Sequence, residues 1–221
     1  NYSKKQLDKT LFSQNQIKQQ IIEFIAKFIS NPLSQGYILG IKGPPGIGKT
    51  TLIKNGLSQI LNRPVNIINL SGNSDSSYIN GHSFTYEGSK PGKIIDILIS
   101  SNCMNPIIYF DELDKLSNTA QGKEIENLLM NITDTSQNNL FEDKFLSNIS
   151  IDLSKIIFIF AYNDSTNISP ILLDRITEFK LNGYNLDEKS TILSKYIIPD
   201  IINEFNLNSQ ISFSKNSIDF I

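Results

Sequence analysis

The sequence predicts an α/β fold in which helices cover both faces of a parallel β-sheet. Two observations lead to this class. Short apolar runs alternate along the chain with longer segments whose apolar residues recur at helical spacing. A glycine-rich turn also separates the first of these runs from the helix that follows it. Strands that alternate with helices form βαβ units, whose crossover helices pack on the two faces of the sheet.

The first elements form one unit of strand, helix and strand. An amphipathic helix over 14–30 leads into it and is expected to end before Pro32. The unit itself consists of a strand over 37–42, the glycine-rich turn, a helix over 49–61 and a β-rich run over 65–70.

The same alternation continues along the chain. It predicts a helix over 94–100, a strand over 107–110, a helix over 124–132, a strand over 156–161 and a final strand over 176–181. Residues 134–153 have mixed polarity without a clear period. We expect a loop or a small hairpin there.

Chain length and element order predict one α/β domain over 1–182, with 1–32 as its helical lead-in, and a partial helical domain over 183–221. A chain of 221 residues accommodates one full core and part of a second. The chain begins with Asn1 rather than Met and ends before a small domain is complete. We therefore expect it to be a segment of a longer protein.

The second domain is predicted to begin with a helix. Asn185 and Glu188 fit the pattern of a capping box at a helix N-terminus. Pro199 should interrupt this helix, because proline lacks the backbone N–H and its ring clashes with the preceding turn.

Composition excludes several classes of protein. The formal charge of -2 shows no basic excess, so a nucleic-acid partner is not favoured. The longest apolar runs, such as 156–161, are far shorter than the roughly 18 residues that a membrane helix needs. Cys103 is the only cysteine and His82 the only histidine, which excludes an intrachain disulfide and a His-based metal cluster. A reducing, intracellular compartment is expected.

The glycine-rich turn reads GPPGIGKTT and fits a phosphate-binding loop. In such a loop, backbone N–H groups surround the phosphates and a helix N-terminus adds partial positive charge. Lys49 is expected to reach the β- and γ-phosphates, and the Thr50 hydroxyl to coordinate Mg²⁺. The plainer interpretation is a glycine-rich turn before a helix, but the strand before it and the helix after it are the context that the motif requires. The predicted ligands are ATP and Mg²⁺, and the predicted ATP-binding residues are Gly43, Pro44, Pro45, Gly46, Ile47, Gly48, Lys49, Thr50 and Thr51.

Two adjacent carboxylates end the strand in the segment IIYFDELDK. Strand ends open onto the ligand crevice in sheets of this kind. Asp111 is expected to hold Mg²⁺ through its water shell, and Glu112 to polarise the attacking water. The alternative is a solvated acidic turn.

Two further polar residues are candidates for the same chemistry. Asn163 follows the strand over 156–161, which should lie beside the strand that carries Asp111, so Asn163 is placed to orient water near the γ-phosphate. Its plainer interpretation is a turn residue. Arg175 is one of only two arginines in the chain. A planar guanidinium supplied from a neighbouring subunit stabilises a transferring phosphoryl group, whereas the alternative for Arg175 is a surface ion pair with Asp174.

The order of GPPGIGKT, FDELDK, Asn163 and LLDR resembles the AAA+ family, a group of P-loop NTPases that usually form rings with each site at a subunit boundary. Three segments are also similar to the ATPase module of the Lon proteases: GHSFTYEGSKPGKI, FLSNISIDLSKIIFI and ISPILLDRITEFKLNGYNLDEK. The resemblance extends from about Leu7 to the end of the chain. It implies that Asp111 and Glu112 form Walker B, that Asn163 is sensor 1 and that Arg175 is the arginine finger.

The resemblance also implies a substrate and an assembly. Tyr86 falls on the aromatic residue of the family's first pore loop, which grips an unfolded polypeptide, although an aliphatic residue usually follows where this chain has Glu87. An ordinary exposed loop tyrosine is the alternative. The expected partners are an unfolded or misfolded protein and further copies of the chain in a hexameric ring, while the segment alone is expected to be monomeric.

Phe12 and Tyr184 are candidates for contact with the adenine base, because Phe12 and Ser13 fall where the family tends to have Tyr and Gly. The family's sensor 2 arginine and its Ser and Lys peptidase dyad have no counterpart and would lie beyond Ile221. Peptidase activity is therefore not expected of this segment.

Three functions remain open at this stage. The first is an ATP-driven unfolding module of a Lon-like protease. The second is a stand-alone AAA+ chaperone, or a remodeller that acts on nucleic acid, against which the mild acidity counts. The third is a regulatory module that binds nucleotide without turnover, against which the pair Asp111 and Glu112 counts.

Overall fold

The computed structural model describes residues 2–31, 36–71, 75–83, 85, 87–116 and 119–206. Its centre is a five-stranded sheet with the strand order β2-β3-β6-β1-β7, and all neighbouring strands are parallel. The strands are β1 (Ile38–Lys42), β2 (Val65–Asn69), β3 (Ile107–Asp111), β6 (Ile157–Tyr162) and β7 (Thr177–Lys180). The predicted α/β class is confirmed.

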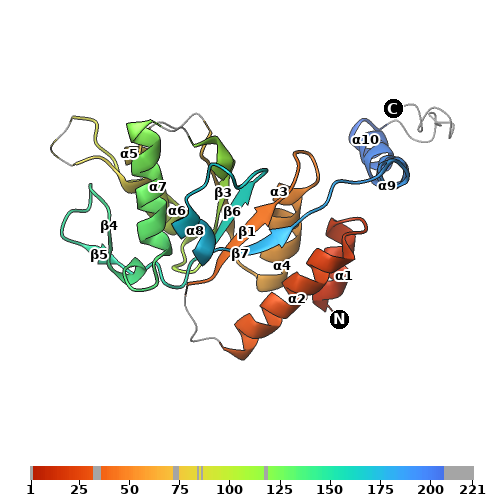
Figure 1. Cartoon of the computed structure of the whole chain (residues 1–221), viewed down its shortest axis with the longest axis horizontal. Coiled ribbons are helices and arrows are strands. Elements are labelled where there is room, and N and C mark those ends of the chain that lie inside the picture. Colours follow the sequence, from red (N-terminus) through yellow and green to blue (C-terminus); the bar gives the residue numbers. More distant parts are fainter. Residues whose placement is uncertain are drawn as a thin grey trace.

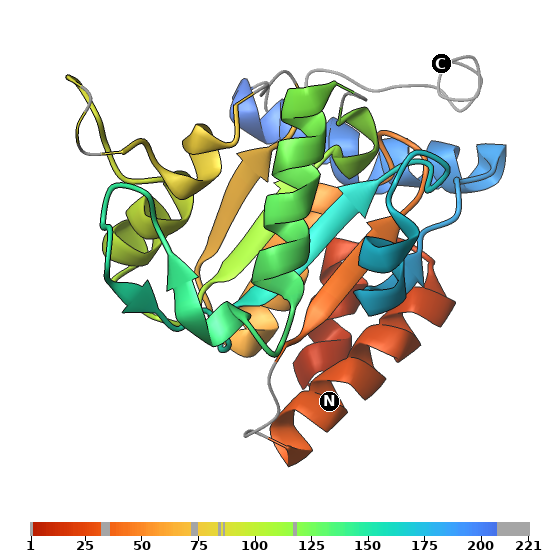
Figure 2. The ribbon, with the colours of Figure 1, turned by 60° about the vertical axis from the view of Figure 1, so that its left-hand side comes forward.

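Alternate residues of each strand point to opposite faces of the sheet, so the buried side chains form two clusters. In β3, Ile108 and Phe110 belong to one cluster, and Ile107 and Tyr109 belong to the other. The first face is covered by α5 (Ser77–Asn80), α6 (Lys93–Ser101), α7 (Ala120–Thr133) and α8 (Pro170–Arg175). The second is covered by α1 (Tyr2–Thr10), α2 (Asn15–Ser30) and the helix after β1 (Figures 1 and 2). Helices therefore lie on both faces, as predicted.

The lead-in consists of two helices rather than one. α2 matches the predicted helix, whereas α1 was not predicted as a separate element. Lys18 of α2 is only 7% exposed, and its ammonium lies 2.8 Å from the carboxylate of Asp8 in the last turn of α1. The hydrogen bond from Lys18 lowers the pKa of Asp8. This pairing fixes the angle between the two helices.

The helix after β1 runs without a break as α3 (Lys49–Thr51), a π-helical segment (Leu52–Leu57) and α4 (Ser58–Leu61). A Cβ at Gly56 would lie 3.5 Å from Thr10 and 3.6 Å from Leu7, so α1 packs closely against this helix. The predicted helix over 49–61 is confirmed, and α1 supports the helix that begins at Lys49.

The predicted excursion over 134–153 contains a small hairpin. A 3-10 turn (Asn138–Leu140) leads into β4 (Phe141–Glu142), which pairs antiparallel with β5 (Ser150–Ile151). Its buried residue Phe141 and the following Leu153 join the cluster on the α7 side of the sheet. The hairpin is thus anchored to the domain rather than free in solvent.

Tyr162, at the end of β6, crosses beneath β1 to reach the edge strand. Its hydroxyl donates a hydrogen bond to the carboxylate of Glu178 on β7 at 2.8 Å. A Cβ at Gly40 of β1 would lie 2.9 Å from this hydroxyl, so the absence of a side chain at Gly40 makes the crossing possible. Burial and the contact with Glu178 raise the pKa of Tyr162. The crossing fixes the end of β6, directly before Asn163.

The C-terminal helix begins at the predicted capping box. The side chain of Asn185 accepts a hydrogen bond from the backbone N–H of Glu188 at 2.8 Å. The Glu188 carboxylate accepts one from the backbone N–H of Asn185 at 3.0 Å. α9 (Leu186–Ile192) continues through a π-helical segment (Leu193–Ile197) into α10 (Ile198–Glu204).

The predicted interruption at Pro199 is therefore wrong. In the π-helical segment before Pro199, each backbone N–H bonds to the fifth preceding carbonyl instead of the fourth. The helix can therefore continue past a proline, which has no N–H to donate. Figure 1 shows α9 and α10 to one side of the sheet. The domain boundary near 182 stays a prediction. Among the described residues, no helix is long and apolar enough to cross a membrane.

Candidate functional site

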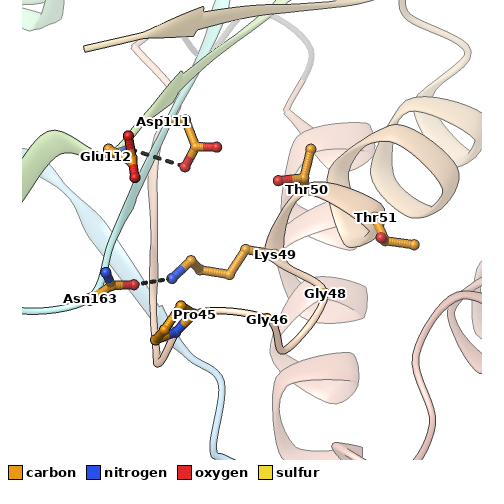
Figure 3. A pocket seen from close by; sticks show the side chains of 9 residues that line it. All are labelled: Pro45, Gly46, Gly48, Lys49, Thr50, Thr51, Asp111, Glu112 and Asn163. Carbon is orange, nitrogen blue, oxygen red and sulfur yellow. Dashed lines mark hydrogen bonds between the residues drawn. The ribbon is translucent and has the colours of Figure 1, made fainter. Parts of the chain in front are cut away.

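A cavity of about 370 Å³ opens where β1, β3 and β6 end, at the carboxyl edge of the sheet. In open α/β sheets this edge is where ligands bind. Figure 3 shows the side chains that line it: Pro45, Gly46, Gly48, Lys49, Thr50, Thr51, Asp111, Glu112 and Asn163. The fold thus brings three separate predicted segments around one space.

The glycine-rich loop has a backbone conformation that depends on its glycines. Gly46 and Gly48 have φ angles of 74° and 93°, which L-residues with side chains rarely adopt. Gly43 is packed behind the loop, where a Cβ would lie 2.5 Å from the carbonyl oxygen of Leu181. Ile47 is buried, so its side chain anchors the loop to the core. Gly43, Pro44 and Ile47 are not among the residues that line the cavity.

Lys49 lies at the centre of the cavity. Its ammonium donates to the carbonyl of Gly43 at 2.6 Å. It also donates to the side-chain oxygen of Asn163 at 2.5 Å, the contact that Figure 3 shows. Burial lowers the pKa of Lys49, and the carboxylates of Asp111, Asp114 and Glu112 oppose that shift. Lys49 is thus a cation surrounded by carboxylates at the mouth of an anion-binding loop.

Thr50 and Asp111 face each other across Tyr109. The tyrosine hydroxyl lies 3.5 Å from the Thr50 hydroxyl and donates to Asp111 at 3.3 Å. Burial raises the pKa of Tyr109, so it remains a neutral hydrogen-bonding group. A hydroxyl and a carboxylate are ligands that suit Mg²⁺, which often binds proteins through one or two side chains and keeps several waters. The pair therefore fits the predicted metal.

Tyr109 was not among the predicted site residues. One signal was available in the sequence, because Tyr109 is the polar-tipped residue of an apolar strand and lies two positions before Asp111. Residues two apart in a strand share a face. The Tyr109 side chain is therefore expected to point to the same face of the sheet as the Asp111 carboxylate.

Glu112 occupies an unusual backbone conformation. Its φ and ψ angles are 60° and 44°, in the left-handed helical region, and its N–H donates to the side chain of Asp111 at 3.0 Å. Asp114 follows with one carboxylate oxygen that is buried without a hydrogen-bond partner. The turn after β3 is therefore partly buried and hydrogen-bonded at the edge of the cavity.

Asn163 lies where the sequence placed it, directly after β6, the strand between β1 and β3. This order puts Asn163 between the phosphate-binding loop and the two carboxylates. Its contact with Lys49 joins the end of β6 to the start of α3 at the cavity.

Arg175 lies apart from the cavity lining, at the end of α8. Its guanidinium donates to the backbone carbonyl of Met130 at 2.5 Å and to the carboxylate of Asp134 at 2.9 Å. The ion pair is thus formed with Asp134 and not with Asp174, which the sequence had suggested. Hydrogen bonds from Ser136, and more weakly Arg175, lower the pKa of Asp134.

The two candidates for the adenine base lie beside the loop but do not line the cavity. Phe12 packs edge-on against Tyr196, with ring centroids 6.3 Å apart, and Tyr184 is half-buried. Burial raises the pKa of Tyr184. Their sequence neighbours touch the loop, since a Cβ at Gly48 would lie 3.2 Å from Leu11 and one at Gly183 would lie 3.7 Å from Pro44. Tyr86, the pore-loop candidate, lies outside the described residues, and the adjacent Glu87 is exposed.

Comparison with known proteins identifies close relatives. Residues 39–184 match the model of the family described as ATPase family associated with various cellular activities. A "Lon protease homolog" of Acanthamoeba polyphaga mimivirus is 41% identical over 97% of this chain and 20% of its own length. A "Lon protease" of Cytophaga hutchinsonii is 38% identical over 98% of this chain and 26% of its own length. A "Lon protease homolog 2, peroxisomal" of Oryza sativa subsp. indica is 38% identical over 94% of this chain and 23% of its own length. The chain thus corresponds to about a fifth to a quarter of these relatives.

Proposed function

The chain belongs to the AAA family of ATPases, and from this premise we propose that it binds ATP with Mg²⁺ and hydrolyses it as the ATPase module of a longer, Lon-like protein. One observation carries the proposal. The loop with Lys49, the carboxylates Asp111 and Glu112, and Asn163 line a single cavity although they come from three strands.

Binding is assigned to the loop and to Lys49. The backbone N–H groups from Gly46 to Thr50 and the start of α3 supply donors and partial positive charge for the phosphates. Lys49 adds a full charge, which neutralises the β- and γ-phosphates. Thr50 and Asp111 hold Mg²⁺, and the metal supplies further neutralisation of charge on the phosphate oxygens.

Hydrolysis is assigned to Glu112 and Asn163. Glu112 orients and polarises the attacking water, and its left-handed backbone directs the residue to the cavity rather than along the strand. Asn163, which is in contact with Lys49, orients that water near the γ-phosphate. Catalysis of phosphoryl transfer depends mainly on such positioning and on charge stabilisation.

Arg175 is assigned to the site of a neighbouring copy. It does not line the cavity of its own chain, and two contacts with the end of α7 hold its guanidinium in place. A planar, fixed guanidinium suits a transferring phosphoryl group that approaches from outside. This assignment requires a ring or another assembly of the longer protein.

The use of the hydrolysis energy is inferred from the relatives, whose names describe proteases. We propose an unfolded polypeptide as the substrate, with Tyr86 as the residue that contacts it. A reducing compartment is proposed from the single cysteine.

The decisive experiment measures phosphate release by the longer protein, with and without a permanently unfolded protein, for the natural sequence and for Tyr86→Ala. We expect ATPase activity that the unfolded protein stimulates, and loss of the stimulation in Tyr86→Ala. Tyr2→Ala, which removes an exposed tyrosine of α1 outside this segment, serves as the control. Activity without any response to unfolded protein would favour a different cargo, and nucleotide binding without turnover would favour a regulatory module.

A further inference from the structure

Asp143 is the one carboxylate whose residue is fully buried in the part of the chain that the structure describes. It follows β4 and is 0% exposed. A buried carboxylate is costly unless hydrogen bonds compensate for lost water. The backbone N–H groups of Gly92 and Phe145 each donate to it at 2.9 Å. Phe145 belongs to the same hairpin, but Gly92 lies 51 residues away along the chain.

Gly92 forms one end of a segment, residues 81–92, whose two ends meet. A Cβ at Gly92 would lie 2.5 Å from the backbone nitrogen of Gly81 and 2.2 Å from the carbonyl oxygen of Ile79. A Cβ at Gly81 would lie 2.5 Å from a carboxylate oxygen of Asp143, and its φ angle is 83°. Only glycine fits at either position. The three residues Gly81, Gly92 and Asp143 form what we call the neck of the segment.

The neck is tied to three elements. The N–H of Gly81 donates to the carbonyl of Ser77, the first residue of α5, and the carbonyl of Gly92 accepts from the N–H of Asp96 in the first turn of α6. The backbone N–H of Lys144 donates to the carbonyl of Asn80 at 2.8 Å, which adds a second link from the hairpin. A carboxylate close to the first residues of α6 is also favoured by the helix dipole. Asp143 and its neighbour Lys144 thus supply the contacts between the neck and the hairpin, and the N–H of His82 donates to the carbonyl of Lys90 at 3.3 Å within the segment itself.

We propose that Asp143 is a positioning residue that holds the neck closed and joins segment 81–92 to the hairpin over 141–151. Both ends of the segment are thereby anchored, through the hairpin, to the core cluster on the α7 side of the sheet. The consequence for a polypeptide rests on the proposed function, in which Tyr86 of this segment contacts the substrate. Asp143 takes no part in nucleotide binding, because it does not line the cavity.

Hydrogen exchange on this chain tests the neck by itself. We expect the amide of Gly92 to exchange slowly, and to exchange about tenfold faster or more in Asp143→Ala, because a buried donor then loses its acceptor. Asp143→Asn, which preserves the shape of the side chain, should have a smaller effect in the same direction. Asp152→Ala is the matched control, since Asp152 accepts from Ser154 at 2.8 Å near the same hairpin without touching the neck. Amides of β6 report on the integrity of the sheet.

Activity of the longer protein tests the consequence. Asp143→Asn should keep the basal ATPase rate within about twofold, because the cavity is untouched, and should raise the KM for an unfolded protein several-fold. A structural defect without positioning would instead lower the basal rate and the substrate-stimulated rate together.

The outcomes separate the two proposals. An unchanged exchange rate of the Gly92 amide in both Asp143 variants overturns the proposal that Asp143 holds the neck closed. Faster exchange with an unchanged KM overturns the positioning role while leaving Tyr86 as the contact residue. If Tyr86→Ala leaves the stimulation intact, the substrate assignment fails, and the role of Asp143 toward the substrate fails with it.

Discussion

Glu112 is held in a left-handed backbone conformation beside the cavity. For a residue with a side chain this conformation costs about 1–2 kcal/mol. Such strain persists only where the surrounding structure imposes it, and it is concentrated at functional sites. At Glu112 the strain accompanies a carboxylate that lines the cavity, next to Asp111, whose side chain accepts its N–H.

Glu112→Gln is expected to leave ATP binding intact and to stop turnover. The amide has the shape of the carboxylate but cannot polarise water as a base does. Binding of a fluorescent ATP analogue and release of phosphate, measured on the same preparation, test both halves of this expectation. Undiminished phosphate release would refute the role of Glu112.

Glu112→Gly is expected to raise the free energy of unfolding while also stopping turnover. Glycine adopts the left-handed conformation without the steric cost, although its greater freedom in the unfolded chain offsets part of the gain. Because of that offset, we expect a net gain of up to about 1 kcal/mol in denaturant unfolding. A loss of stability would show that contacts of the Glu112 side chain outweigh the backbone strain.

At the scale of elements, the end of α7 holds the arginine of α8. Arg175 bonds to the last full turn of α7 through Met130 and to Asp134 directly after it. The two helices also pack through the buried side chains Leu129 and Leu172 in one core cluster. The guanidinium of Arg175 is therefore held against the end of α7.

Arg175→Ala is expected to preserve nucleotide binding and assembly of the longer protein but to lower its ATPase rate by about 10³-fold or more, as for other arginine fingers. Arg63→Ala is the matched control. Arg63, the second arginine, stacks over Phe28 at 4.8 Å and bonds to Lys155, so its loss should affect stability alone. Equal ATPase rates in the two variants would contradict the finger assignment.

At the scale of the whole molecule, the cavity draws on both faces of the sheet. Lys49 begins a helix that packs with α1 and α2 on one face of the sheet. Asp111 ends β3 and Asn163 follows β6, and side chains of both strands also pack on the other face, which α6 and α7 cover. A ligand that bridges the loop and the strand ends therefore stabilises the assembled domain as a unit. Binding to the folded state alone raises its stability by mass action.

ATP with Mg²⁺ at about 100 times its Kd is expected to raise the free energy of unfolding by about 2.7 kcal/mol, visible as a higher Tm. Lys49→Ala should reduce or abolish this shift. Lys54→Ala, which changes an exposed lysine on the same helix, should retain it. A full shift in Lys49→Ala would mean that ATP binds elsewhere.

The sequence alone determined the features that depend on neighbours along the chain. The spacing from Gly43 to Thr50, the helical period over 14–30 and the capping pair Asn185 and Glu188 are local, because backbone geometry relates residues a few positions apart. The alternation of strands and helices gave the α/β class for the same reason. These patterns also located most candidate residues of the site, since parallel strands end at a common edge.

Only the tertiary structure decided which distant residues meet. Arg175 pairs with Asp134, 41 residues away, rather than with its neighbour Asp174, and Asp143 closes a neck around Gly81 and Gly92. Tyr109 joins Thr50 to Asp111 because its side chain points to the face of the sheet on which the helix after β1 packs. Hydrogen-bond partners far apart in the sequence are selected by packing, which the order of residue types does not reveal.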